Sequence, residues 1–374
     1  MSVRLLVNPR ADRPGRLAQQ ILTAKGLAEA RSEIAGWEGY RPTPLADLQG
    51  LAVRLGLGRL WFKDEGQRFK LKSFKALGGP YAIARLVARE GASPDRTFAS
   101  ATDGNHGRAV AWGAARAGCR SVIFVPAAVS DGRAAAIAAF GAKVVRTRGT
   151  YDEAVAECAA TARREGWTVI ADTSEDEQAE VPGLVMEGYM VAVAEAAEQM
   201  SEVPTHVFVQ AGVGGLAAAV AAHFDDRWGA GRPRLVIVEP ETAACLMLAA
   251  ETGGMAQVAG DLETVMGGLS CGIASAPAWR VLDAAVDAFL AIEDARAIEA
   301  MRVLADGEPA IVAGESGAAG LGGLLAVAAE EGMRRQLGLD GASRVLLFGT
   351  EGDTDPDLYT RLVGRSADAV RAGA

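Results

Sequence analysis

The sequence predicts an α/β protein with two lobes, each a mostly parallel, twisted sheet flanked by helices. From about residue 97 onward, short apolar runs alternate with helical stretches, which is the pattern of βαβ units and a parallel sheet. Several of these runs end in a glycine-rich or polar turn that opens a helix, as in ligand-binding α/β sheets. The 374 residues, half of them hydrophobic, suffice for two domains.

The elements can be assigned in order along the chain. Before residue 59 the sequence predicts a helix near 16–31, an extended segment at 41–45 and a helix at 48–55. The expected strands are 59–65, 97–101, 121–125, 143–146, 168–171, 206–210, 234–239, 288–292 and 343–348. The expected helices that follow residue 80 begin at Tyr81 and then cover 105–117, 131–140, 151–165, 185–200, 295–304 and 316–331.

Composition excludes several classes of protein. The net charge of -9 and a pI near 5.1 argue against nucleic acid or an anionic membrane as a partner. No apolar run reaches the roughly 18 residues of a membrane span, and residues 1–10 are too polar for a signal peptide, so we expect a cytoplasmic protein. The four cysteines and three histidines show no metal-ligand spacing, which predicts reduced thiols and no metal site.

Lys75 stands between a predicted strand and a predicted helix. It follows Phe74 and precedes the pair Gly78 and Gly79. Reactive side chains are often carried on such loops, and apolar neighbours can hold a lysine amine partly neutral and nucleophilic. The alternative is a surface lysine in a basic loop.

Residues 101–107 end one strand and open one helix. Free backbone N–H groups at the helix start, with two glycines nearby, favour binding of a carboxylate or another anion. Asp103 is an unusual residue to place beside an anion, so it is a candidate for taking or sharing a proton. Its alternative role is an ordinary N-cap.

Residues 211–216 form a second glycine turn between a strand and a helix. Their amides could hold a phosphate without a charged side chain. However, Gly212, Gly214 and Ala217 also fit the dinucleotide fingerprint, with Glu239 placed to bind a ribose hydroxyl. This segment alone leaves a nicotinamide cofactor and a small phosphorylated one equally open.

Two further segments lie near the C-terminus. Residues 315–320 begin a helix of very small residues, for which close packing is the main explanation. Residues 349–355 place the Thr350 hydroxyl and three carboxylates after the last strand, at the edge where open α/β sheets bind ligands.

Taken together, residues 73–79, 101–107, 211–215, 314–317 and 350–355 resemble the fold type II pyridoxal-phosphate (PLP) enzymes, whose fold is like the tryptophan synthase β subunit. Within them the chain looks most similar to the diaminopropionate ammonia-lyases, because Asp103 stands where related dehydratases carry a small residue.

The resemblance assigns roles to individual residues. Lys75 would form the Schiff base with PLP, Asn105 would contact the ring hydroxyl, and Thr350 would face the ring nitrogen, which favours β-elimination. The residues implied to bind the cofactor are Lys75, Asn105, Gly212, Val213, Gly214, Gly215 and Thr350. Those implied to bind the substrate are Thr102, Asp103, Gly104, His106, Tyr151 and Asp172. For Asp172 and Tyr151 the alternatives are a strand-end cap and a helix-start aromatic.

The implied reaction is α,β-elimination of a small amino acid, with 2,3-diaminopropionate going to pyruvate and ammonia. Lys75 would act as base on the L-isomer and Asp103 on the D-isomer, and Asp172 could bind the β-amino group. The alternatives are a serine, threonine or hydroxyaspartate dehydratase, a nicotinamide-dependent oxidoreductase, and a cofactor-binding homologue without activity.

The resemblance also implies the organisation of the chain. Residues 1–84 with 182–374 would form the large PLP-binding domain and residues 85–181 the small α/β domain, in a homodimer. The chain departs from the family pattern at residues 174–180, which are strongly acidic where the lyases carry an aromatic, glycine-containing segment. This departure bears on closure of the site and on substrate choice.

Overall fold

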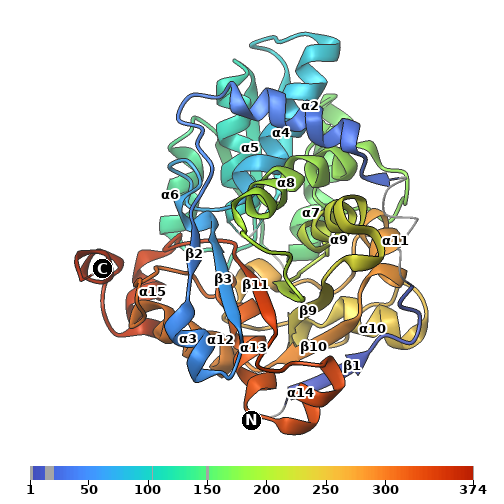
Figure 1. Ribbon diagram of the computed structural model, residues 1–374. Helices are drawn as coiled ribbons and strands as arrows, with labels where there is room; N and C mark the ends of the chain where they lie inside the picture. The colour runs from blue at the N-terminus through green and yellow to red at the C-terminus, as the bar shows by residue number, and fades with distance from the viewer. Residues whose placement is uncertain (1–2, 13–20, 103, 149–150, 374) are drawn as a thin grey trace.

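The computed structural model describes residues 3–12, 21–102, 104–148 and 151–373, and it contains two β-sheets (Figure 1). The larger sheet has the strand order β1-β10-β9-β8-β11-β3-β2. Its five central strands are parallel, and β1 and β2 are antiparallel edges. The bounds are β1 Val3–Val7, β2 Leu45–Asp47, β3 Arg59–Asp64, β8 His206–Gln210, β9 Arg234–Pro240, β10 Ala288–Ile292 and β11 Arg344–Gly349.

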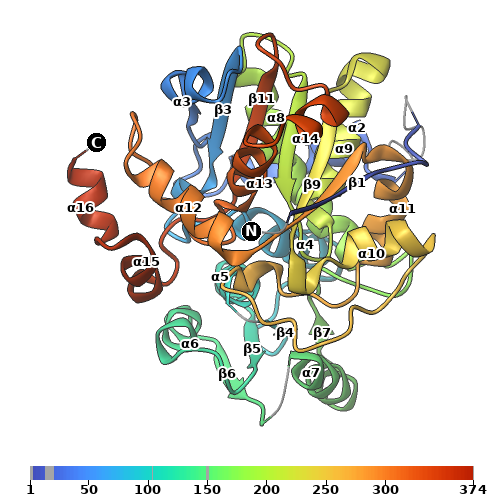
Figure 2. The same ribbon diagram turned by 90° about the horizontal axis from the view of Figure 1, so that it is seen from below.

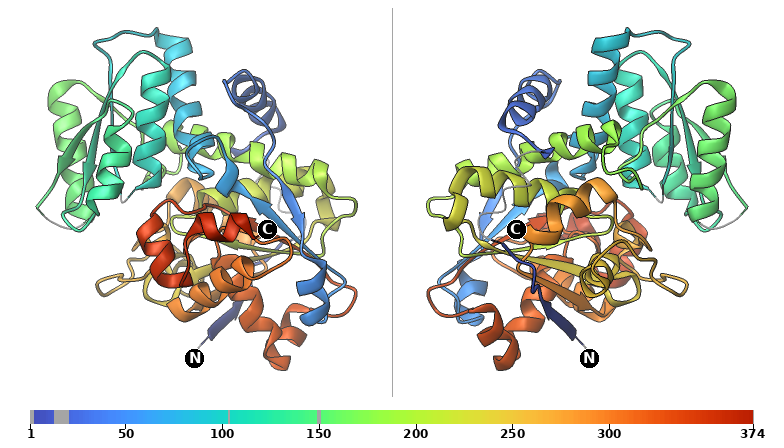
Figure 3. Two further views of the ribbon diagram at one scale, coloured as in Figure 1. Left: turned by 90° about the vertical axis from the view of Figure 1, so that its left-hand side faces the viewer. Right: turned by 90° about the vertical axis from the view of Figure 1, so that its right-hand side faces the viewer.

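The smaller sheet is entirely parallel and has the order β6-β5-β4-β7. Its strands are β4 Thr97–Ala101, β5 Arg120–Val125, β6 Lys143–Arg146 and β7 Thr168–Val169. Figure 3 shows this sheet with its helices as a lobe to one side of the larger one. The two sheets come from separate stretches of the chain, and the predicted α/β fold class is confirmed.

Helices cover both faces of each sheet. In β8, Val207 and Val209 pack into one hydrophobic core with α8 and α9, while Phe208 packs into another with α12 and α13 on the opposite face (Figure 2). In the smaller sheet, Ile123 faces α5 and Phe124 faces α7. The helix bounds are α2 Ala24–Ala35, α3 Gln49–Arg54, α4 Lys75–Glu90, α5 Asn105–Arg116, α6 Asp131–Ala138, α7 Tyr151–Glu165, α8 Glu180–Gln199, α9 Gly215–Trp228, α10 Cys245–Thr252, α11 Ala276–Ala285, α12 Asp294–Ala305, α13 Ala319–Ala328, α14 Glu331–Leu337, α15 Pro356–Val363 and α16 Ala367–Ala372.

The helix α4 leads from the larger sheet into the smaller lobe, and close packing on α8 fixes its direction. A Cβ atom at Gly78 would lie 2.7 Å from Val185 Cγ1, and one at Gly188 would lie 2.9 Å from the Gly78 Cα. Side chains at these positions would force the helices apart, so this helix crossing requires Gly78, the first glycine of the pair after Lys75, together with Gly188.

The main differences from the sequence expectations lie at the edges. The strand β1 was not predicted, because an antiparallel edge strand does not follow the βαβ alternation. The helix α8 begins at Glu180 rather than at residue 185, and Pro182 is tolerated in its first turn. Of the helix predicted at 16–31, residues 16–20 lie outside the described residues, and α2 runs over Ala24–Ala35.

No helix in the described part of the chain is long and apolar enough to span a membrane. The four cysteines are thiols and not disulfides in the structure. The described residues contain no group of acidic, histidine and cysteine side chains that could hold a metal ion.

Candidate active site

Lys75 is the first residue of α4 and projects into a cavity between the two lobes. Its Nζ lies 2.5 Å from Asp172 Oδ2, and the rings of Phe74 and Tyr189 flank it at 5.2 and 5.6 Å. Burial acts to lower the pKa of the Lys75 ammonium, but the Asp172 carboxylate outweighs it and raises that pKa above its ordinary value. The expectation of a partly neutral amine was therefore wrong, because sequence reasoning did not include this buried counter-ion.

The loop before Lys75 is joined to the loop after β11. Since Asp64 at the end of β3 pairs with Gly349 at the end of β11, the segments that follow them start side by side. The Phe74 amide donates to the Thr350 carbonyl at 3.0 Å, and the Gly352 amide donates to the Lys72 carbonyl at 3.0 Å. Lys72 has a φ of 54°, a left-handed conformation that these contacts hold in place. Lys75 and Thr350 are thus fixed relative to each other.

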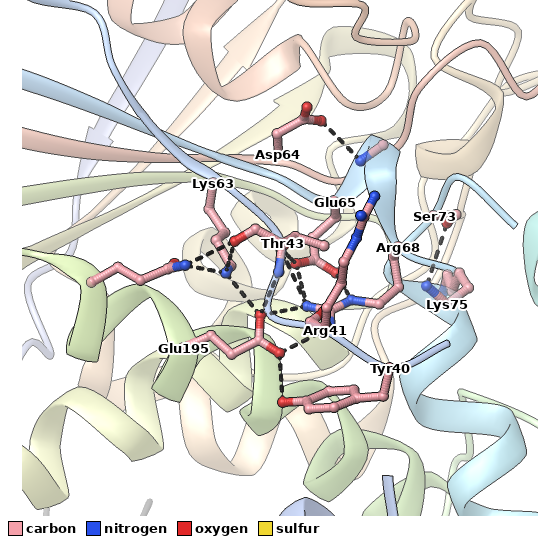
Figure 4. Close-up of polar contacts among 12 residues, drawn as sticks. Tyr40, Arg41, Thr43, Lys63, Asp64, Glu65, Arg68, Ser73, Lys75 and Glu195 are labelled. Carbon is pink, nitrogen blue, oxygen red and sulfur yellow. Dashed lines mark hydrogen bonds and ion pairs between the residues drawn. The ribbon is translucent and has the colours of Figure 1, made fainter. Parts of the chain in front are cut away.

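A buried ionic network supports this loop from behind (Figure 4). Glu195 of α8 accepts hydrogen bonds from Lys63 at 2.8 Å and from Arg68 at 2.7 and 2.9 Å. Arg68 also binds Glu65 at 2.7 and 2.8 Å, and Thr43 donates to Glu65 at 2.5 Å. All five side chains are buried. The network therefore ties the segment that precedes Lys75 to α8, which also carries Tyr189.

The smaller lobe contributes the start of α5. The Thr102 hydroxyl accepts from the amides of Gly104 and Gly107 at 3.0 and 3.1 Å, so it caps this helix. Asn105 donates from Nδ2 to Glu351, which links the helix start to the loop after β11. Asp103 lies outside the described residues, so both its N-cap role and its role as a base stay predictions.

His106 and Asp172 form a polar pocket beside Lys75. The His106 Nε2 lies 3.0 Å from the Ile170 carbonyl, which can only accept, so Nε2 carries the hydrogen. Burial lowers the pKa of His106, so the ring is neutral and Nδ1 is an acceptor. This atom lies 3.8 Å from Asp172 Oδ2 and has no hydrogen-bond partner among the described residues. The two side chains therefore present acceptors to whatever occupies the place of the Lys75 ammonium.

The glycine loop after β8 forms a cradle of backbone amides. Gly214 has a φ of 101° and directly precedes α9. The first turn of the helix is closed by a hydrogen bond from the Ala218 amide to the Gly214 carbonyl, at 2.9 Å. The amides of the first turn are thus available to an anion. A Cβ at Gly212 would lie 2.9 Å from the Cys271 sulfur, so the cradle has no room for larger side chains.

The nicotinamide alternative fails at Glu239. This residue is fully buried at the end of β9, and its carboxylate accepts from the amides of Leu246 and Met247 at 2.7 and 2.9 Å. It caps the start of α10 and does not line the cavity. Glu239 therefore does not stand where the fingerprint would need it to bind a ribose.

The opposite end of the cavity carries Thr350, Glu315 and Glu351. The Gln210 side-chain amide donates to the Thr350 hydroxyl at 2.9 Å, and Glu351 accepts from the Ser316 amide at 3.1 Å. Burial, reinforced by the nearby Glu351 charge, raises the pKa of Glu315 to about 8. Residues 315–316 thus line the site as well as starting a packed segment, which the sequence analysis had taken chiefly as packing.

The structure brings nearly all the predicted site residues to this one cavity. The predicted residues that line it are Lys75, Thr102, Gly104, Asn105, His106, Tyr151, Asp172, Gly212, Val213, Gly214, Gly215 and Thr350. Sequence reasoning missed Tyr189 and Gln210. Tyr189 lies inside a buried apolar helix, which gives no signal. Gln210 is a polar residue at the end of an otherwise apolar strand, directly before the glycine loop, and this signal could have been used.

The donors and acceptors of the cavity fit a small aromatic aldehyde phosphate. A lysine amine lies between aromatic rings, a glycine cradle with free amides can take a phosphate, and a hydroxyl at the far end can meet a ring nitrogen. Buried polar atoms of the lining that lack partners among the described residues, such as His106 Nδ1 and Tyr189 Oη, are consistent with a site built for a polar ligand.

Comparisons with known proteins agree with this chemistry. The family described as pyridoxal-phosphate dependent enzyme matches residues 37–347. Diaminopropionate ammonia-lyase of Escherichia coli (strain K12) is 38% identical over 371 residues, covering 93% of this chain and 92% of that enzyme. The crystal structure of the Escherichia coli lyase in complex with an aminoacrylate-PLP azomethine reaction intermediate is 34% identical, covers 97% of each chain and has a TM-score of 0.90. The biosynthetic L-threonine dehydratase of Escherichia coli (strain K12) is 30% identical over 217 residues, covering 58% of this chain and 39% of the dehydratase.

Proposed function

The chain belongs to the pyridoxal-phosphate-dependent enzymes, and we propose that it is a lyase which converts 2,3-diaminopropionate and water to pyruvate and two ammonia. The observation that carries this proposal is the pair of acceptors formed by Asp172 and His106. It holds an ammonium group, that of Lys75, in a buried position next to the cradle. A diamino acid is a small substrate with a second ammonium group that can take this place.

The cofactor is pyridoxal 5'-phosphate, which supplies an electron sink for negative charge at the substrate α-carbon. We propose that Lys75 attaches it covalently and that the amides of residues 212–215 bind its phosphate. Thr350 would meet the ring nitrogen. The Oδ1 of Asn105 would accept a hydrogen bond from the ring hydroxyl, because Nδ2 is already bonded to Glu351.

The chain's own residues would promote loss of the β-amine. An amine leaves readily as neutral NH₃ only from its ammonium form, so the site must keep that nitrogen protonated. Burial acts to raise the pKa of Asp172, but the charge and hydrogen bond of Lys75 outweigh it and lower that pKa well below its usual range. Asp172 therefore stays a carboxylate, and the neutral His106 adds a second acceptor.

Two bases are available for the α-proton. The Lys75 amine is free for the L-isomer once the substrate has replaced it on the cofactor. We propose Asp103, at the start of α5, for the D-isomer. Thr102, Gly104 and Tyr151 would complete the binding of the substrate, with the helix start holding its carboxylate.

The second candidate is a serine or threonine dehydratase, favoured by the partial similarity to threonine dehydratase. The buried Asp172 carboxylate argues against it. A hydroxyl substrate brings no second ammonium group, and a buried carboxylate left without a counter-ion costs several kcal/mol. Residues 174–180 are acidic in this chain, which likewise suits a cationic substrate.

Three proposals concern the whole molecule. We propose the division into a large domain of residues 1–84 with 182–374 and a small one of 85–181, because each stretch carries one of the two sheets. We also propose a cytoplasmic homodimer, on the family resemblance. Limited proteolysis tests the division, and analytical ultracentrifugation of the purified protein tests the dimer.

The decisive assay measures pyruvate and ammonia from D- and L-2,3-diaminopropionate, with serine, threonine and hydroxyaspartate in parallel. We expect two ammonia for each pyruvate and a clear preference for the diamino acid. Lys75→Ala should abolish turnover. Equal or better turnover of a hydroxyl substrate would establish the dehydratase. A protein that binds the cofactor but turns over none of these substrates would be the inactive homologue.

A further inference from the structure

Gln210 holds the Thr350 hydroxyl in a fixed role. This glutamine is the last residue of β8, its side chain is 2% exposed, and it lines the cavity. Its Nε2 lies 2.8 Å from the Phe348 carbonyl, 3.1 Å from the Gly317 carbonyl and 2.9 Å from Thr350 Oγ1. Three elements of the larger domain therefore meet at one amide group.

The orientation of this amide follows from its partners. Backbone carbonyls only accept hydrogen bonds, so the atom that faces Gly317 and Phe348 must be the N–H₂ group. The reversed amide would place its oxygen against two backbone carbonyl oxygens in a buried site. The group has two hydrogens for three acceptors, so two of the contacts share one hydrogen. Because an amide nitrogen does not accept hydrogen bonds, the contact with Thr350 can only run from Gln210 to the hydroxyl oxygen.

This contact leaves the Thr350 hydroxyl hydrogen for a different partner. A hydroxyl that accepts from Gln210 can still donate once. Within the part of the chain that the structure describes, no acceptor receives that hydrogen, and Thr350 faces the cavity. The cavity side of Thr350 is therefore a donor.

We propose that Gln210 is a positioning residue that makes Thr350 a hydrogen-bond donor and so keeps the ring nitrogen of the cofactor unprotonated. A ring nitrogen that accepts from Thr350 cannot also carry a proton. This step rests on the proposed placement of the ring nitrogen at Thr350, and it goes beyond it by naming the residue that sets the polarity of the contact.

The consequence is a control of reaction type. An unprotonated ring withdraws electrons more weakly than a protonated one. Negative charge at the α-carbon is then relieved by prompt loss of the β-substituent, rather than persisting long enough for return of a proton. Gln210 would therefore favour elimination over racemisation, although we expect it to touch neither the substrate nor the reacting atoms.

The test uses the full-length enzyme reconstituted with cofactor labelled with ¹⁵N at the ring nitrogen. Wild-type protein should give the ¹⁵N chemical shift of an unprotonated pyridine. In Gln210→Glu the introduced carboxylate accepts from Thr350, whose oxygen then faces the ring and favours its protonation. In Gln210→Met no donor holds Thr350, which is then free to turn. In at least one of these variants the signal should move toward the pyridinium position.

Activity gives a second readout. The ratio of α-hydrogen exchange to pyruvate formation should rise in the same variants, with elimination falling about tenfold, the rate equivalent of one hydrogen bond. Gln199→Met is the matched control, because its amide also donates to a buried carbonyl, that of Thr43 at 3.0 Å, but lies away from the cavity. It should change thermal stability without moving the ¹⁵N signal.

Two results would overturn the inference: a wild-type signal already at the pyridinium position, or a signal unchanged in both Gln210 variants. An unchanged signal in both variants would mean that Gln210 only links neighbouring segments of the fold. The measurement requires only bound cofactor, so a failure on diaminopropionate as substrate would leave this test intact and would count against the proposed function alone.

Discussion

Replacing Glu195 by glutamine should destabilise the protein by about 3–5 kcal/mol, the typical cost of leaving a buried charge without its partner. The Glu195 side chain is 2% exposed and receives hydrogen bonds from Lys63 and Arg68, which are equally buried. It also accepts from the Tyr40 hydroxyl at 3.0 Å and the Thr43 amide at 3.2 Å. Glutamine has the same shape, but it would leave two cations facing the single carboxylate of Glu65.

Glu198→Gln is the matched control for this experiment. Glu198 lies one turn further along α8 and pairs with Arg31, yet both side chains are 45% exposed. Solvent screens this pair, so its loss should cost between 0 and about 1 kcal/mol. The comparison therefore varies burial while keeping the helix and the substitution constant.

The assay is equilibrium unfolding in urea of both variants and of the wild type, read by circular dichroism. Burial acts to raise the pKa of Glu195, but the hydrogen bonds from Arg68 outweigh it and lower that pKa below its ordinary value of 4.5. Stability contributed by a lowered pKa is present above the unfolded value and is lost as the pH falls through the folded one. The difference in the free energy of unfolding between wild type and Glu195→Gln should thus be largest at pH 7 and become smaller below pH 4.5. Equal losses in the two variants at pH 7 would refute the reasoning.

Three further predictions follow from the site and its surroundings. Asp172→Asn should lower kcat/KM for 2,3-diaminopropionate by about 10- to 100-fold, the value of one hydrogen bond to a charged group, and lower it much less for serine; equal losses would remove Asp172 from the ammonium site. Asp103→Asn should reduce turnover of the D-isomer by about 10²–10⁴-fold, the usual contribution of a general base, and leave the L-isomer much less affected. Burial raises the pKa of Glu239 to about 8, so this group contributes stability that is present below pH 4.5 and lost as the pH rises through 8. The stability of Glu239→Gln relative to wild type, measured by thermal melts, should therefore increase from pH 5 to pH 9, and a constant difference would show that Glu239 is ionised throughout.

The central strands could be predicted closely because parallel strands covered on both faces read as continuous apolar runs. The runs at 206–210 and 288–292 coincide with β8 and β10. The edge strands β1 and β2 were missed because they pair antiparallel and do not alternate with helices. A short extended segment becomes a strand only when a neighbour offers its hydrogen bonds, and the sequence does not show that neighbour.

The candidate site was predictable where its residues lie in local motifs. Lys75, the glycine loop and Thr350 each stand after a strand, in a local motif that made them candidates, and the family resemblance assigned their roles. The charge state of Lys75 could not be predicted in this way. Its counter-ion Asp172 lies 97 positions further along the chain and belongs to the other lobe. Burial of that ion pair depends on how the two lobes meet.

The two lobes contribute different groups to the site. The glycine cradle and the Thr350 loop follow strands of the larger sheet, whereas His106 and Asp172 follow strands of the smaller one. Lys75 lies at the junction, because α4 starts beside the larger sheet and packs against α5 of the smaller lobe. The groups proposed to bind the cofactor therefore come mostly from one lobe, and those proposed to select the substrate from the other. Cofactor binding and substrate choice can then vary independently, and the ammonium site is complete only where the lobes are in contact.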